Sequence, residues 1–186
     1  SAGTTVTVYN GGAEIGNISA KSGSISIAAN KGQIGAVDSK LGNVAVGSNV
    51  KTQQNAGNAV GNEGRIESLT AGTSVTVYRN TGRVGALDAQ TSVTIGQGNN
   101  ASADVRAYNV NSGSIGSVAA ATSVAIHSIA QGSVAMQSGQ SVSAGTSVAI
   151  GSEQNANAND IGPVQCQTTS SIYNGAGSVS SLTSGS

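Results

Sequence analysis

The chain has 186 residues, of which 27 are Gly and none is Phe or Trp, and only 9 % are charged. Eight basic residues balance eight acidic ones without clustering, which argues against a nucleic-acid or anionic-membrane partner. No apolar run approaches the roughly 18 residues of a membrane-spanning helix. We expect one domain over residues 1–186, with a thin core of Val, Ile, Leu and Ala.

Two short arms alternate along the chain, and both have the pattern of β-strands. The first arm reads S-V-x-V, with apolar residues at period two, and the second reads G-x-I-G-x-V. The first arm recurs at Val6/Val8, Ile25/Ile27, Val44/Val46, Val75/Val77, Val93/Ile95, Val124/Ile126, Val148/Ile150 and around Ile172. The second arm recurs at Ile15/Ile18, Ile34/Val37, Ile66/Leu69, Val84/Leu87, Ile115/Val118, Val134/Met136, Ile161/Val164 and Val179/Leu182.

A unit of 18 or 19 residues separates the regular copies, as from Val6 to Ile25 and from Val75 to Val93. One such unit cannot bury its apolar side, but stacked copies can, with each Val or Ile lying on its equivalent. Sandwiches and closed barrels give no reason for this repetition, and the β-branched, Gly-broken sequence disfavours helices. The sequence therefore predicts an all-β fold, a single β-solenoid (β-helix) of about eight two-arm coils.

Longer intervals between the arms predict insertions in coils 3, 5 and 7. They cover residues 47–63, 96–112 and 151–160, and all three are rich in Asn, Gln and Ala. One interpretation is that they are solvated loops at a tolerant corner. The other is that they interleave with a neighbouring molecule, because Asn/Gln-rich segments of low charge form cross-β ladders.

Residues that could carry chemistry are few. His127 is the only histidine, so we expect a corner or outward side chain rather than a catalytic one. Asp38 and Asp88 take equivalent positions in their arms, which indicates a solvated corner rather than an acid/base pair. No calcium-binding loop and no dinucleotide motif is present. We predict no enzyme activity, no cofactor, no metal site and no small-molecule substrate.

Two residues are candidates for covalent modification. Cys166 is the only cysteine, which excludes an internal disulfide and makes it either a buried thiol or the partner in an intermolecular disulfide. Asn100 begins an N-glycosylation acceptor pattern, Asn100-Ala101-Ser102, inside an insertion. The chain starts at Ser1 rather than Met, from which we expect a secreted, extracellular protein whose leader has been removed.

Both ends of the predicted solenoid lack a protective cap. The first arm begins within a few residues of Ser1, and Val179/Leu182 lie close to Ser186. The only proline, Pro163, lies one coil from the end. Soluble solenoids cover their end strands with helices, charges or polar repeats, because a bare edge pairs with other chains. We expect these edges to pair with another copy.

The two-arm unit of about 19 residues resembles the repeats of filamentous-haemagglutinin-type β-solenoids. As a small Ser/Gly/Ala/Val-rich chain with open ends and a lone Cys, it is also similar to the sheath-forming, functional-amyloid proteins of filamentous methanogenic archaea. That resemblance implies subunits stacked into hoops or tubes around cells, and it assigns no site residues.

The sequence thus predicts an extracellular structural protein that self-assembles through end-to-end β-ladders into a fibre, hoop or sheath. The alternative is a binding module, either an adhesin-type β-helix or an ice-binding solenoid. In such a module, the outward-facing positions of the first arms would mix Thr, Ser and Ala, as at Thr7, Ala45 and Thr94.

Overall fold

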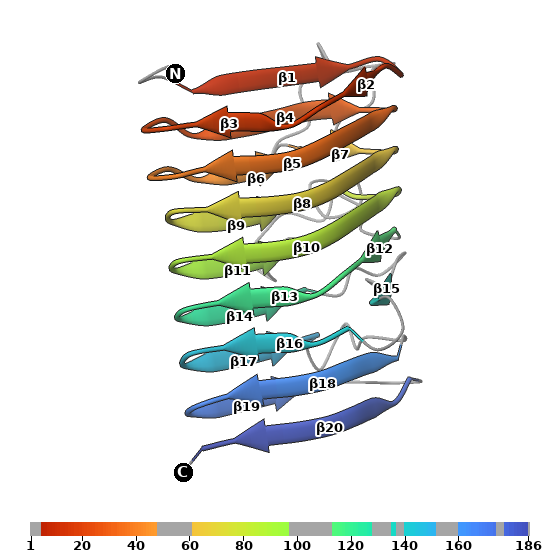
Figure 1. Ribbon diagram of the computed structural model, residues 1–186. Coiled ribbons are helices and arrows are strands. Elements are labelled where there is room, and N and C mark those ends of the chain that lie inside the picture. Colours follow the sequence, from red (N-terminus) through yellow and green to blue (C-terminus); the bar gives the residue numbers. More distant parts are fainter. Residues whose placement is uncertain are drawn as a thin grey trace, which may run out of the picture.

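In the computed structural model, the strands form two sheets that face each other along the whole stack (Figure 1). The structure describes residues 5–47, 61–96, 113–127, 135–136, 140–151, 160–173 and 177–185. None of the described residues is helical. The chain passes from one sheet to the other and back, so strands from the two sheets alternate along the sequence.

One sheet consists of the first arms in chain order, with β7 beside β4. Its strands are β1 (Val6–Asn10), β4 (Ile25–Asn30), β6 (Val44–Val46), β7 (Gly61–Asn62), β9 (Ser74–Val77), β11 (Ser92–Ile95), β14 (Ser123–Ile126), β17 (Ser147–Ile150) and β19 (Thr169–Ile172). We call it the first sheet.

The second sheet consists of the second arms, again in chain order. Its strands are β2 (Glu14–Ile15), β3 (Ile18–Ala20), β5 (Gln33–Ser39), β8 (Arg65–Ala71), β10 (Arg83–Ala89), β12 (Ser114–Ile115), β13 (Val118–Ala120), β15 (Ala135–Met136), β16 (Val142–Ala144), β18 (Ile161–Cys166) and β20 (Val179–Ser184). Where an arm is interrupted, two short strands take the place of one long strand: β2 and β3 both pair with β5.

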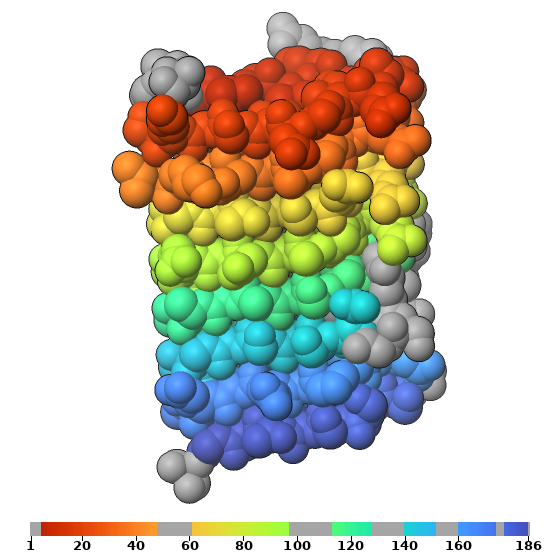
Figure 2. Space-filling view, in the orientation of Figure 1, coloured from red at the N-terminus to blue at the C-terminus, as the bar shows by residue number. Residues whose placement is uncertain are grey.

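All pairings are parallel, and they place equivalent arm residues beside each other. Val75 pairs with Val44 on one side and Val93 on the other, and Leu87 pairs with Leu69 and Val118. A parallel, in-order stack of this kind follows from the repeated arms, because each apolar residue is covered by its equivalent in the next layer. The arrangement is all-β and consistent with a β-solenoid. Figure 2 shows the layers following one another in sequence order.

The core is a thin apolar seam between the two sheets. The inward residues of the regular arms are almost completely buried, among them Ile25, Val77, Ile66 and Leu87. Their neighbours along each strand are half-buried or exposed, as the period-two pattern predicts. A third inward column holds small residues, which run from Ala71 and Ala89 to Ala144 and Cys166.

One second arm differs from the sequence prediction. We placed it at Val134/Met136, but the structure pairs Val118 with Val142 and Ile115 with Met136. The repeat pattern predicts two apolar residues a few positions apart, whereas extra residues separate Met136 from Val142. The interval from Val124 to Val142 is therefore also longer than that from Val75 to Leu87, and the extra length is not confined to alternate coils.

The tight corner between the second sheet and the next first-sheet strand continues the backbone ladder. Thr91 N donates to Thr73 O at 2.8 Å, Thr122 N to Thr91 O at 2.9 Å, and Thr146 N to Thr122 O at 2.7 Å. The hydrogen-bond network therefore extends around this corner instead of ending at each strand.

Glycines with positive φ follow three first-sheet strands. They are Gly47, Gly96 and Gly151, with φ of 80°, 83° and 69°. A Cβ on Gly96 would lie 2.8 Å from the O atom of His127, the residue that follows β14, so both the backbone conformation and the space require glycine there. The predicted insertions begin at these glycines, and their residues 48–60, 97–112 and 152–159 lie outside the described residues.

Candidate functional site

Within the described residues, β1 has a strand on one side only. Val6 N donates to Ser24 O at 2.9 Å, toward β4. Successive residues of a parallel strand direct their backbone groups to opposite neighbours. The N–H and C=O of Thr7 therefore point away from β4, along the axis of the stack.

The N-terminal edge of the second sheet has the same form at β3. Ile18, Val37, Leu69 and Leu87 are successive register partners across the second sheet, so their backbone groups point the same way. The N–H of Leu87 donates to Ser117 O at 2.8 Å, toward the C-terminal end of the stack. By the same alternation, the N–H of Ser19 points away from β5. Together, β1, β2 and β3 form what we call the N-terminal edge.

The opposite end of the stack is built from β19 and β20, which we call the C-terminal edge. Tyr173 N donates to Ile150 O at 2.8 Å, so the N–H groups of Ser170 and Ile172 point away from β17. Gly185 N donates to Cys166 O at 3.1 Å, so that of Leu182 points away from β18. No described strand covers this edge.

In the part of the chain that the structure describes, the apolar seam is open at both edges. Val6, Val8, Ile15 and Ile18 at the N-terminal edge are only partly buried, although their equivalents in the next layer are fully buried. Leu182 at the C-terminal edge is 52 % exposed, whereas Val164, its partner on β18, is 0 % exposed. β1, β3, β19 and β20 contain neither a charged residue nor a proline, the usual means by which edge strands are protected, whereas β2 carries the charged Glu14.

A ladder of buried asparagines lines the corner after the first-sheet strands. Asn10 Nδ2 donates to Asn30 Oδ1 at 2.8 Å, Asn30 Nδ2 to Asn62 Oδ1 at 2.7 Å, and Asn62 Nδ2 to Asn80 Oδ1 at 2.8 Å. All four side chains are nearly inaccessible to solvent. We call this set the Asn ladder, and it supplies the partners that such buried amides require.

The Asn ladder also holds the turns that follow it. Asn10 Oδ1 accepts the N–H groups of Gly12 and Ala13, and Asn62 Nδ2 donates to Arg83 O at 3.0 Å in the next layer. This ladder is not among the features predicted from the sequence. Its signal is the recurrence of Asn-x-Gly at Asn10, Asn30, Asn62 and Asn80; the same phrase also begins at Asn55 and Asn111, which lie outside the described residues.

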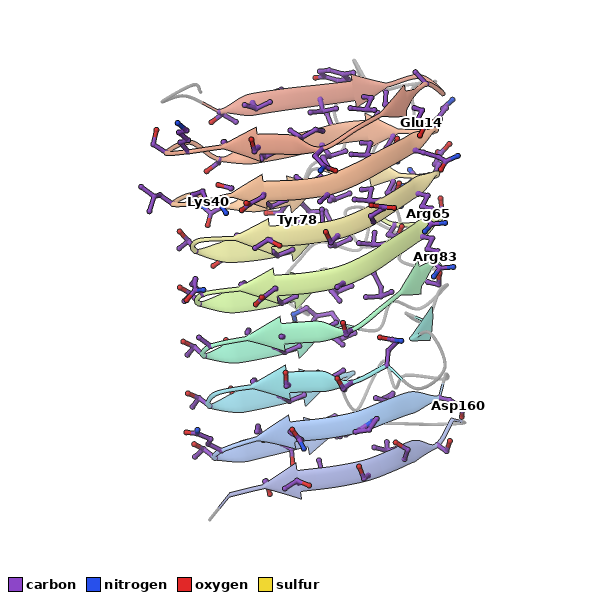
Figure 3. The ribbon with its side chains drawn as sticks, viewed as in Figure 1. Glu14, Lys40, Arg65, Tyr78, Arg83 and Asp160 are labelled. Carbon is purple, nitrogen blue, oxygen red and sulfur yellow. The ribbon has the colours of Figure 1, made fainter. Side chains whose placement is uncertain are left out.

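Several charged side chains of the second sheet lie in columns along the stack. Arg65 and Arg83 are register partners on β8 and β10, and Figure 3 shows them near the same corner as Glu14. Asp38 and Asp88 are both register partners of Thr70, so one strand separates them, as their equivalent arm positions predict. Asp38 instead pairs with Lys40 at 2.6 Å. After Arg106 the only charged residues are Glu153 and Asp160.

Among the acidic groups of the described residues, Asp160 is the one whose pKa is shifted. The backbone N–H and the hydroxyl of Ser178 both donate to its Oδ1, at 2.9 and 2.8 Å, and these hydrogen bonds lower the pKa of the carboxyl. Because Ser178 precedes β20, this exposed carboxylate ties the last described strand to the layer before it.

His127 lies in line with Tyr78, as its arm position predicts. Its backbone N donates to Ile95 O at 2.8 Å, and that of Tyr78 donates to Val46 O at 2.8 Å. The imidazole is half-buried, and this burial lowers its pKa. Within the described part of the chain, no three His, Cys, Asp or Glu residues gather as metal ligands would, and no helix is long and apolar enough to cross a membrane.

Cys166 is a free thiol at the end of β18 and is 7 % exposed. It pairs with Ala144 on one side and Ser184 on the other, so it occupies the small-residue column. It lies beside a shallow open hollow of about 510 Å³, which Gln165 and Gln167 also line. The predicted intermolecular disulfide stays a prediction, and it would require the thiol to be reached past β20. Asn100 lies outside the described residues.

Comparisons with family models, curated proteins and solved structures found no match to this chain.

Proposed function

We propose that this protein is an extracellular structural protein that assembles end to end through its backbone ladders into a fibre, hoop or sheath. The observation that carries the proposal is the pair of bare edges. Within the described residues, each presents backbone groups that face no neighbouring strand and an open end of the apolar seam. A second copy of the chain supplies both a matching strand and a matching apolar layer.

The proposed subunit is a β-solenoid of eight two-arm coils. In it, each coil contributes one layer to each sheet, and the insertions at 47–63, 96–112 and 151–160 leave one corner and provide lateral contacts. The function is mechanical. A continuous ladder of backbone hydrogen bonds, closed at the corners by threonine backbones and by the Asn ladder, resists denaturants and proteases.

The composition of the edges supports self-association over a free monomer. Natural monomers protect an edge strand with lysines, prolines or a covering element. The end strands have none of these within the described residues. Glu14 on β2 is the only charged residue of the end strands that would pair, and no charged residue of β19 or β20 opposes it, so two copies approach each other without repulsion between like charges on these strands.

The test uses prolines that remove outward N–H groups. Thr7→Pro with Ser19→Pro deletes one such donor from β1 and one from β3 but leaves the bonds to β4 and β5 intact. Proline is tolerated in an edge strand when its missing N–H faced solvent. We expect residues 1–186 to form assemblies visible by negative-stain microscopy, and the double variant to remain small in light scattering after size-exclusion chromatography.

The matched control is Thr7→Val with Ser19→Val, which keeps both N–H groups and the β-propensity of the strands. It should assemble like the unaltered chain. Far-UV circular dichroism should show the same β-sheet content in all three proteins. An unaltered chain that stays monomeric at high concentration would refute the proposal.

A further inference from the structure

The first and last layers of the stack have the same spacing between their columns. In the first sheet, Ser170 continues the column that begins at Val6, and Ile172 continues the column that begins at Val8. In the second sheet, Leu182 continues the column that begins at Ile18. The residue numbers differ by 164 in each of these three pairs.

Equal spacing means that one edge fits the other in both sheets at once. If an end layer had extra residues between its two arms, as the layer from Val124 to Val142 has, its strands would still pair with those of the next copy. The segment that joins its two arms would, however, be longer than the segment facing it. The last layer, from Ser170 to Leu182, has the same interval as the first, from Val6 to Ile18. Its corner therefore meets a corner of equal length.

The exposed tyrosines strengthen this match. Tyr9 follows Val8 and is 75 % exposed, and Tyr173 follows Ile172 and is 41 % exposed. The phrase Tyr-Asn-Gly occurs only at these two places in the sequence, beginning at Tyr9 and at Tyr173. Two parallel strands in register lie about 4.8 Å apart, which brings equivalent aromatic rings into stacking contact.

We propose that assembly is head to tail, with the C-terminal edge of one copy on the N-terminal edge of the next, in the register Ser170 to Val6, Ile172 to Val8 and Leu182 to Ile18. This inference rests on the proposed function and specifies its partner, polarity and register. Within the stack, Tyr78 N donates to Val46 O, the residue paired with Val77. By the same rule, at the junction Tyr9 N donates to Ile172 O and Thr7 N to Ser170 O.

Polarity is tested with complementary caps. The N-capped protein carries Thr7→Pro and Ser19→Pro, and the C-capped protein carries Ser170→Pro and Leu182→Pro, which remove outward N–H groups from β19 and β20. Head-to-tail pairing needs one open edge of each kind, so either capped protein alone should be a monomer. An equimolar mixture should form one-to-one dimers and nothing longer, as measured by sedimentation velocity.

Register is tested with cysteine pairs in a Cys166→Ala background, in which Ala matches its column partner Ala144. Thr7 and Ser171 share an outward column, so T7C and S171C copies should form a disulfide-linked dimer when mixed and oxidised. The control mixes T5C with S171C. That pair is two residues out of register, about 8 Å apart, beyond the reach of a disulfide.

The outcomes separate this inference from the proposed function. Dimers of the N-capped protein alone, or cross-linking of T5C and S171C in preference to T7C and S171C, would overturn the polarity or the register while assembly itself stands. Failure of the unaltered chain to assemble removes both proposals. Dimers only in the mixture, with at least about tenfold preference for the in-register disulfide, support the inference.

Discussion

Replacing Asn62 with alanine should destabilise the stack more than any single exposed polar substitution. Asn62 is 0 % exposed. Its Oδ1 accepts from Asn30 Nδ2 at 2.7 Å, and its Nδ2 donates to Asn80 Oδ1, Arg83 O and Gly64 O at 2.8, 3.0 and 3.1 Å. One of the two amide hydrogens is shared, so three bonds count independently.

The expected loss follows from these contacts. Each buried hydrogen bond contributes about 1 kcal/mol net, and a partner left buried without water costs more. We expect Asn62→Ala to lower the free energy of unfolding by about 3 kcal/mol. Asn62→Asp keeps the volume but replaces the donors with oxygens facing Arg83 O and Gly64 O. It should therefore lose at least as much, which excludes a cavity as the cause.

The assay is guanidinium unfolding followed by far-UV circular dichroism, because the chain has no Trp. It should use the N-capped protein, so that association does not add to apparent stability. Asn17→Ala is the matched control: its side chain is exposed and only accepts Ala36 N at 3.0 Å. A loss for Asn62→Ala within about 0.5 kcal/mol of this control would refute the stabilising role of the Asn ladder.

Three other predictions concern single residues. Gly96→Ala should lower the free energy of unfolding by about 1–3 kcal/mol in the same assay, because alanine is strained at φ of 83° and its Cβ would meet His127 O. The control Gly16→Ala, which has open space and no positive φ, should lower it little. Equal losses for the two variants would contradict the reasoning. The folded-state pKa of Asp160 lies below its ordinary 3.8, so its stabilisation of Ser178 is present above that pH and lost as pH falls through the lowered pKa. The protection of the Ser178 amide against hydrogen exchange should fall as the pH falls through this pKa. If the same loss of protection persists in Asp160→Asn, another titrating group causes it. The Cys166 thiol, being 7 % exposed, should react with a thiol reagent at least about tenfold more slowly in the folded protein than in guanidinium, and comparable rates would mean that β20 opens freely.

The strands and their order were predictable because the stack repeats one simple pattern. Val75 and Val77 alternate with polar residues, and the structure buries them against equivalents from the neighbouring arms. The same logic placed Asp38 and Asp88 in one column, and His127 in line with Tyr78. Period-two alternation and a period near 19 residues determine these positions, because each strand pairs with its own copy.

What the sequence did not reveal depends on contacts that periodicity does not encode. Predicting the Asn ladder would require evidence that its four side chains point inward, at Asn10, Asn30, Asn62 and Asn80. Asn in a Gly-rich corner is usually solvated. Met136 and Val142 belong to one arm although extra residues separate them. The closely spaced pair Val134/Met136 fits the repeat pattern better, so the sequence predicts the arm there. The tie between Asp160 and Ser178 joins two layers, which no local pattern records.

The most direct test of the account is cryo-electron microscopy of the unaltered 186-residue chain. We predict polar assemblies in which β19 and β20 of one subunit pair in parallel with β1 and with β2 and β3 of the next, with the strand spacing of about 4.8 Å unbroken across the junction. Monomers alone, or assemblies joined only through the outer faces of the sheets with β1 and β19 left unpaired, would contradict it.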